Sequence, residues 1–246
     1  MERNSNSASG LQKLKYITDS SSLLELERGT VHVWHLPYDS VSLTGEFVNP
    51  DYLSEEERNC ASKFKFDKDR NLYLLSHCAL RLVLSVYIDC SPAGILIERS
   101  CLGKPLLSSR QNQNDIRFNM SHSGRFIAIA IAKSKEVGID IECIKDIPEA
   151  AGIVYALFDE EEALVLERTP LTRQGEVFLS LWTRKEAYLK ATGAGLFAMK
   201  RSLVDRMQNV QRYTITELEL DKDYKAALAV EGNGVSFRLF CLRDHK

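Results

Sequence analysis

Apolar residues along the chain change their spacing several times, and each spacing predicts a type of element. Alternation of apolar and polar side chains predicts a first strand in VHVWHL, residues 31–36. Three more strands are predicted in the middle of the chain: IRFNMS, FIAIAIA and VGIDIE. SHSG would form the turn between the first two of these. YTITELEL, KAALAVE and VSFRLFCL, separated by the turn sequences DKD and GNG, predict a final group of strands.

Helical spacing dominates two other regions. Between residues 67 and 88, apolar side chains recur every three or four positions and predict one long amphipathic helix. SEEE, at residues 54–57, is a capping box that opens a shorter helix before it. In the second region, Asp159 caps LFDEEEALVLE with Glu162 closing the box, and VFLSLWTRKEAYLKATGAG runs on to the stop signals Gly193 and Gly195.

The order of these elements predicts an α+β fold made of two halves. The halves would meet near residues 133–136, after a Gly-Pro loop at 103–105 in the first half. We expect a flexible N-terminal extension over residues 1–29, a first α+β half over 30–134 and a second over 135–246. No clear sequence repeat relates the halves.

Composition indicates a compact globular protein without a bulk electrostatic partner. The 246 residues are 44% hydrophobic, and the formal net charge of -2 gives no general attraction to nucleic acid or to an anionic membrane. The longest apolar run, residues 126–132, is far below the roughly 18 residues of a membrane span, and we recognise no targeting segment. Six cysteines without a CxxC pair fit a reducing cytoplasm better than a disulfide framework.

The predicted strand VGIDIE carries two carboxylates at alternate positions. Side chains alternate across a strand, so Asp140 and Glu142 share one face while Val137, Ile139 and Ile141 share the other. Such a pair most often belongs to the solvent-exposed face of a sheet. The alternative is a divalent cation, which relieves the repulsion between two neighbouring carboxylates.

A second pair of charged residues lies in WTRKEAYLK, where Glu186 and Lys190 are four residues apart on one helical face. Alone, this pair indicates a surface ion pair worth about 0.3 to 0.5 kcal/mol. Combined with Asp140 and Glu142, Glu186 would complete a cation site of three carboxylates, with Lys190 one turn away to hold phosphate oxygens.

The motifs GKP, FNMSHSG, VGIDIE and WTRKEAYLKATGAGL occur in this order within about ninety residues. In this combination the chain, from about Val31 to Leu242, resembles the 4'-phosphopantetheinyl transferases of the longer, surfactin-type class. The resemblance implies a monomer of two similar halves related by pseudo-two-fold symmetry, with coenzyme A in the cleft between them. The phosphopantetheine arm of coenzyme A would pass to a serine of an apo acyl or peptidyl carrier protein, releasing adenosine 3',5'-bisphosphate.

The resemblance also implies roles for individual residues. Asp140, Glu142 and Glu186 match ligands of Mg2+, with Mn2+ as a possible substitute, and Asp140, Glu186 and Lys190 form the catalytic group. Glu186 matches the general base toward the carrier serine, and Lys190 the residue that stabilises the diphosphate and protonates the leaving group. Contacts to coenzyme A are implied for Lys190 and four further residues: Arg70, Lys104, Ser121 and His122.

The sequence departs from this family at the predicted 3'-phosphate site. Arg70 is the implied 3'-phosphate ligand, but Cys60, Asn71 and His77 stand where many relatives carry further basic residues. This places coenzyme A affinity in question and leaves the reaction class unaffected. Relatives place their carrier-binding surface on the helices after VGIDIE, as an apolar patch with basic edges.

Two other functions remain open at the level of sequence. A phosphohydrolase with a carboxylate-metal site would release inorganic phosphate and would need neither Lys190 nor the SHS sequence. A catalytically silent module would bind coenzyme A or carrier proteins without modifying them, although the costly cluster of charges argues against it. The sequence does not identify the physiological carrier, the preferred metal or the role of residues 1–29.

Overall fold

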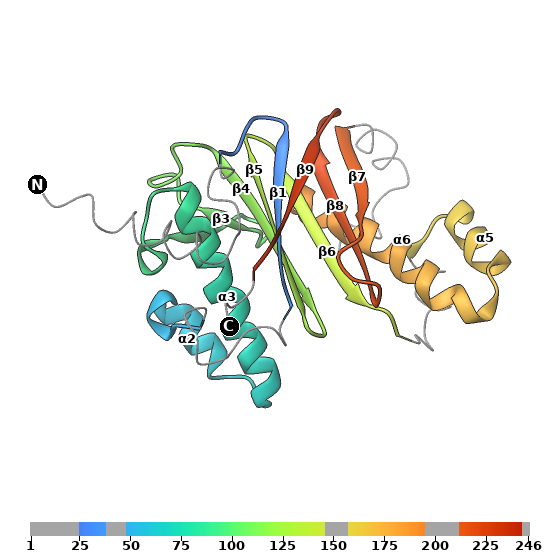
Figure 1. Ribbon diagram of the computed structural model, residues 1–246, viewed down its shortest axis with the longest axis horizontal. Helices are drawn as coiled ribbons and strands as arrows, with labels where there is room; N and C mark the ends of the chain where they lie inside the picture. The colour runs from blue at the N-terminus through green and yellow to red at the C-terminus, as the bar shows by residue number, and fades with distance from the viewer. Residues whose placement is uncertain (1–24, 38–47, 146–156, 195–211, 243–246) are drawn as a thin grey trace, which may run out of the picture.

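The computed structural model describes residues 25–37, 48–145, 157–194 and 212–242 (Figure 1). The expected N-terminal extension therefore lies almost entirely outside the described residues, as do positions 146–156 after the VGIDIE strand. No helix within these four described ranges is long and apolar enough to cross a bilayer.

The first half is built around three antiparallel strands in the order β4-β5-β1, with the long helix α3 packed on one face (Figure 1). Helix α2 and a two-stranded hairpin, β2 and β3, complete it. The elements are β1 (Thr30–Pro37), α2 (Glu55–Ala61), α3 (Asp67–Tyr87), β2 (Ile97–Arg99), β3 (Pro105–Leu107), β4 (Ile116–Ser123) and β5 (Phe126–Lys133), with short 3-10 helices η2 (Pro50–Tyr52) and η3 (Pro92–Gly94).

The second half repeats this topology. Its strands are antiparallel in the order β6-β8-β7, and its long helix α6 packs on one face. The elements are β6 (Val137–Cys143), α5 (Glu160–Arg168), α6 (Leu171–Thr192), β7 (Tyr213–Leu218) and β8 (Tyr224–Glu231). In both halves the first strand pairs with the last and the middle strand lies outside, with a helix between the first two. The α+β class is confirmed, and the pseudo-two-fold symmetry of the halves stays a prediction.

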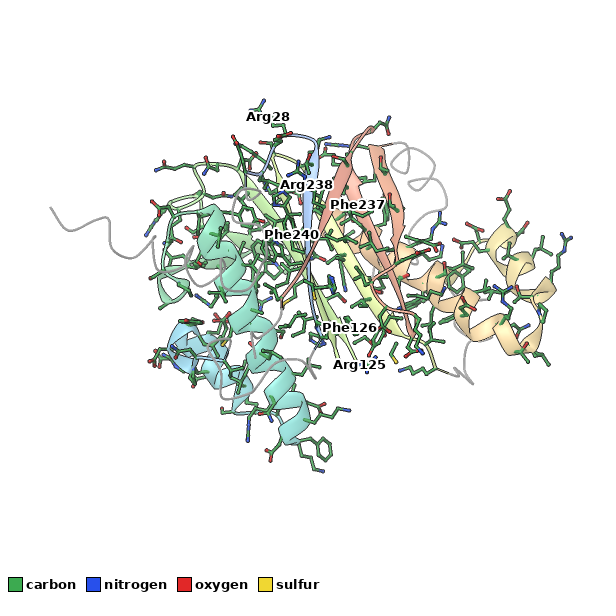
Figure 2. All side chains as sticks on the ribbon, in the orientation of Figure 1. Arg28, Arg125, Phe126, Phe237, Arg238 and Phe240 are labelled. Atoms are coloured by element: carbon green, nitrogen blue, oxygen red, sulfur yellow. The ribbon has the colours of Figure 1, made fainter. Side chains whose placement is uncertain are left out.

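The last strand, β9 (Ser236–Cys241), leaves the second half and pairs in parallel with β1. The larger sheet therefore has the order β4-β5-β1-β9. Figure 2 shows Phe237, Arg238 and Phe240 along this edge strand. A division of the chain at residue 134 thus separates two strand groups in sequence, while β9 joins them in space.

Two apolar layers explain the arrangement of sheets and helices. One layer lies between the larger sheet and α3 and contains Trp34 and Ile129. The other lies between the two sheets, and Val137, Ile139 and Ile141 of β6 are fully buried in it. Because side chains alternate along a strand, the opposite face of β6 is turned toward α6.

Local signals fixed most element boundaries. Ser54 and Asp159 form complete capping boxes at the starts of α2 and α5, and Gly193 ends α6 with a left-handed φ of 71°. The prediction of a turn at SHSG is wrong, because β4 continues through Ser123 and the turn is Gly124-Arg125. Pairing with β5 and contacts with β6 override the turn preference of these polar residues. Figure 2 shows Arg125 next to Phe126 at this end of the strands.

Candidate active site

The face of β6 that is turned toward α6 carries Gly138, Asp140 and Glu142. A Cβ added to Gly138 would lie 2.0 Å from the carbonyl oxygen of Ala187 and 2.4 Å from the nitrogen of Ala191. The missing side chain therefore allows the helix backbone to approach β6 closely. The two carboxylates of β6 lie under the last turns of α6 as a result, and their shared face confirms the prediction from alternation.

Helix α6 presents Glu186 and Lys190 one turn apart. The ammonium Nζ of Lys190 lies 2.6 Å from Asp140 Oδ1 and donates a 2.9 Å hydrogen bond to Ser121 Oγ. Ser121 in turn donates to Asp140 Oδ1 at 2.9 Å. Strand β4, strand β6 and helix α6 thus bring three of the predicted residues into one hydrogen-bonded cluster.

The carboxylates of Asp140, Glu142 and Glu186 are buried or partly buried, and Lys190 balances only one of their negative charges. Burial raises the pKa of Glu186, and repulsion from Asp140 raises it further, while Lys190 opposes both effects. Burial likewise raises the pKa of Glu142, the hydrogen bond from Ser123 opposes this, and Asp140 again adds to it. A positive charge placed among these three groups would stabilise their ionised forms.

The fit of this site to a cation rests on Asp140. Its side chain is almost fully buried, and no described residue gives its Oδ2 a hydrogen bond. A buried carboxylate oxygen without a partner is costly unless a positive group completes it. As the side chains stand, no group of three metal-ligating residues in the described ranges is already gathered around one point. The three carboxylates and the unpartnered Asp140 Oδ2 fit a divalent cation. In their present positions the three carboxylates do not surround a common point.

Two polar residues of β4 that the sequence interpretation did not single out also contact β6. Asn119 Oδ1 accepts a 2.9 Å hydrogen bond from the Ile139 backbone nitrogen. Ser123 Oγ donates to Glu142 Oε2 at 2.7 Å and accepts from the Cys143 nitrogen at 3.1 Å. Their alternation with Ser121 was the available signal. It was missed because SHSG was taken as a turn.

Lys104 points into the joint between the halves. Its Nζ lies 2.6 Å from Glu136 Oε2 and donates to the carbonyl oxygens of Ala191, at 2.7 Å, and Val137, at 3.2 Å. The side chain is only 8% exposed. The ammonium therefore ties the β2–β3 hairpin to the start of β6 and the end of α6, and its implied contact with a nucleotide stays a prediction.

The remaining predicted contacts lie on the α3 side. Alternation along β4 places His122 on the face opposite Ser121. Burial lowers the pKa of His122, and the positive charges of Lys190 and His77 lower it further. Arg70 forms an ion pair with Asp67 at 2.8 Å on the exposed first turn of α3. The roles of these residues toward coenzyme A phosphates stay predictions.

A cavity of about 280 Å3 adjoins the cluster. Glu186, Lys190 and Asn119 supply polar groups to its lining. Apolar wall comes from Leu102, Pro105, Met120 and Leu189. A cavity with apolar walls and charged groups is suited to a flexible ligand that has a phosphate at one end.

Two family models match the chain in succession. The N-terminal model of the 4'-phosphopantetheinyl transferases matches residues 45–134, and the 4'-phosphopantetheinyl transferase superfamily model matches residues 136–239. The chain belongs to this superfamily. The two matched regions meet at residues 134–136, next to the ion pair between Lys104 and Glu136.

Similar curated transferases cover much of the chain. The 4'-phosphopantetheinyl transferase HetI of Nostoc sp. is 28% identical over 86% of this chain and 92% of its own length. The transferase gsp of Aneurinibacillus migulanus is 29% identical over 71% of this chain and 75% of its own. The transferase psf-1 of Bacillus pumilus is 35% identical over 59% and 60%. The surfactin-type interpretation of the motifs is confirmed, and the chain is a 4'-phosphopantetheinyl transferase.

Proposed function

We propose that this transferase moves the 4'-phosphopantetheine arm of coenzyme A to a serine of an apo acyl or peptidyl carrier protein. The proposal rests on the hydrogen-bonded cluster of Lys190, Asp140 and Ser121, which lies beside the cavity and leaves Asp140 Oδ2 without a partner. The cavity offers apolar contacts for the pantetheine arm, while Lys190 offers a cation for the diphosphate.

The residues suit an in-line displacement at phosphorus. The carrier serine oxygen forms a bond to the phosphorus that bears the pantetheine, and the bridging P–O bond breaks to release adenosine 3',5'-bisphosphate. Glu186 accepts the serine proton, a role favoured by the raised pKa of its carboxylate. Lys190 donates to a diphosphate oxygen and supplies a proton to the leaving group.

Asp140, Glu142 and Glu186 would hold a divalent cation, Mg2+ or Mn2+. When bound, the cation offsets the negative charge of the diphosphate. Ser121 keeps Asp140 in place from the neighbouring strand. Arg70, His122 and Lys104 are candidates for the outer parts of coenzyme A, with Lys104 requiring release from Glu136 to reach a ligand.

The carrier surface is proposed on the helices of the second half. Leu164 and Val165 of α5 and Leu171 at the start of α6 are exposed apolar side chains. Arg168 and Arg173 are close to them in sequence and would supply the basic edges of such a surface. Carrier proteins are typically acidic along the helix that follows their serine, so docking here would rely on these arginines. The acidic run Glu160–Glu162 either faces away from the carrier or limits the set of carriers. We further expect a monomer acting in the cytoplasm.

The test is intact-mass measurement of a panel of apo carrier proteins after incubation with coenzyme A and Mg2+. We expect a gain of one phosphopantetheine arm, lost with EDTA and in Asp140→Ala. Glu186→Gln should lower the rate by at least 10²-fold, the lower range for removing a general base. Glu219→Gln, an exposed carboxylate on the same half, is the matched control and should retain the rate.

Unmodified carriers, despite measurable coenzyme A binding, would contradict the proposed transfer. Release of inorganic phosphate from coenzyme A in place of carrier modification would indicate hydrolysis. A Glu186→Gln variant that kept a near-normal rate would remove Glu186 from both of its proposed roles.

A further inference from the structure

Strands β4 and β6 lie side by side although they belong to different sheets. Each is the edge strand of its own sheet, and an edge strand presents unpaired backbone groups along its open side. The ladder bonds of β4 go to β5 and those of β6 go to β8. The link between the two edges must therefore come from other groups.

Side chains of β4 make this link. Asn119, Ser121 and Ser123, here called the polar seam, occur at alternate positions and therefore face β6 together. Asn119 Oδ1 accepts a hydrogen bond from the backbone N–H of Ile139, and Ser123 Oγ accepts one from the backbone N–H of Cys143. These two bonds fix both ends of the β6 segment that carries the carboxylates.

Between these ends, each carboxylate of β6 receives one serine of the seam. Ser121 donates to Asp140 Oδ1 at 2.9 Å, and Ser123 donates to Glu142 Oε2 at 2.7 Å. A hydroxyl has one proton to donate and lone pairs to accept with. Because Ser123 accepts from the Cys143 N–H, its proton is free to be directed at Glu142.

We propose that Ser123 is a positioning residue that sets the orientation of the Glu142 carboxylate for a divalent cation. The proposal rests on the proposed function, since it takes Glu142 as a cation ligand. It also explains the second serine of the SHS sequence, which faces β6 and the carboxylates while His122 faces the opposite side. Partners that orient metal ligands commonly change metal affinity 10- to 100-fold when they are removed.

The experiment measures Mn2+ binding by electron paramagnetic resonance, without coenzyme A or carrier. Ser123→Ala should raise the Kd for Mn2+ roughly 10-fold, the lower end of the range for such partners. Ser123→Thr keeps the hydroxyl and should bind nearly as well as the wild type. Ser123→Val has the shape of Thr without the hydroxyl and should lose affinity as Ala does, which separates the hydrogen bond from packing.

A matched control exists elsewhere on the molecule. Ser180 of α6 donates to Glu217 Oε1 at 2.7 Å, the same distance as the bond between Ser123 and Glu142, but at an exposed site. Ser180→Ala should leave Mn2+ affinity unchanged. Thermal unfolding of each variant, followed by circular dichroism, would show that the affinities refer to folded protein.

Three results would overturn the proposal, and they are distinguishable. Equal Mn2+ affinity of wild type and Ser123→Ala would refute the positioning role alone. A coenzyme A affinity that falls in Ser123→Ala under EDTA, with Mn2+ affinity unchanged, would show that Ser123 contacts the phosphates. Failure of the wild type to bind Mn2+, or unchanged binding in Asp140→Ala, would refute the cation site of the proposed function and the positioning role with it.

Discussion

Gly138→Ala would test the close approach of α6 to β6, on which the whole cluster depends. The added Cβ would lie 2.0 Å from the Ala187 carbonyl oxygen, where ordinary contact begins near 3.4 Å, so the shortfall is 3.4 − 2.0, or 1.4 Å. The atoms in the way belong to the helix backbone and are fully buried. No rotamer change relieves such a contact, so the helix must move by more than an ångström.

The consequences for stability and for activity follow from this displacement. Overpacking in a core typically costs about 1 to 3 kcal/mol, and we expect about 3 kcal/mol here because backbone must shift. Lys190, at 2.6 Å from Asp140, moves with the helix. A misplacement of about 1 Å commonly costs about 10²-fold in rate. Urea unfolding measures the first effect, and the rate of carrier mass gain on folded protein measures the second.

Gly175→Ala on the same helix is the matched control. Among the residues that the structure describes, its added Cβ would meet the Lys145 carbonyl oxygen at 3.2 Å, so a shift of a few tenths of an ångström suffices there. Alanine gains about 1 kcal/mol over glycine in a helix interior, which offsets this contact. We expect a net change within about 1 kcal/mol and an unchanged rate. A Gly138→Ala variant as stable and as active as the wild type would refute the argument for close approach.

Three further perturbations test other parts of the structure. Lys104→Met should cost about 1 to 3 kcal/mol in urea unfolding because it removes the hydrogen bonds to the Ala191 and Val137 carbonyl oxygens, while Glu136 keeps its ion pair with Arg117. It should also lower kcat more than it raises the KM for coenzyme A; a pure KM effect would support a nucleotide contact. Burial lowers the pKa of His32 to about 4, so the unfolded chain takes up a proton first and stability should fall, by roughly 2 to 3 kcal/mol, between pH 6.5 and 4; His32→Gln should flatten this slope. Burial acts to raise the pKa of Glu57, but hydrogen bonds, led by that from His77, hold it at about 2. Its stabilising effect is present above pH 4.5 and should be lost toward pH 2, and Glu57→Gln should remove that loss.

The part of the site that was predictable from sequence is the part set by local periodicity. Alternation along a strand assigned Asp140 to one face of β6 and Ile139 to the other, and both assignments are confirmed. Helical spacing likewise placed Glu186 next to Lys190. These relations need only the type of element, which the apolar pattern supplies.

The relations that the sequence did not reveal depend on partners far along the chain. The local sequence around Ser123 is typical of a turn. In the structure its strand pairs with β5, and its hydroxyl is hydrogen-bonded to Glu142 and to the backbone nitrogen of Cys143 in β6. Lys104 has its acceptors in Glu136 and in the Ala191 carbonyl, the latter 87 residues away. A loop lysine carries no pattern that distinguishes such a tie from an exposed ligand contact.

The second half contacts the first half at both edges of the larger sheet. At one edge β4 contacts β6 through the polar seam, and at the other β9 pairs with β1. The carboxylates belong to the second half, but the serines that orient them belong to the first. Neither half alone therefore contains an oriented site, and loosening either edge should disorder the carboxylates before it unfolds the sheets. The placement of the charged cluster at the joint makes correct docking of the halves a condition for catalysis.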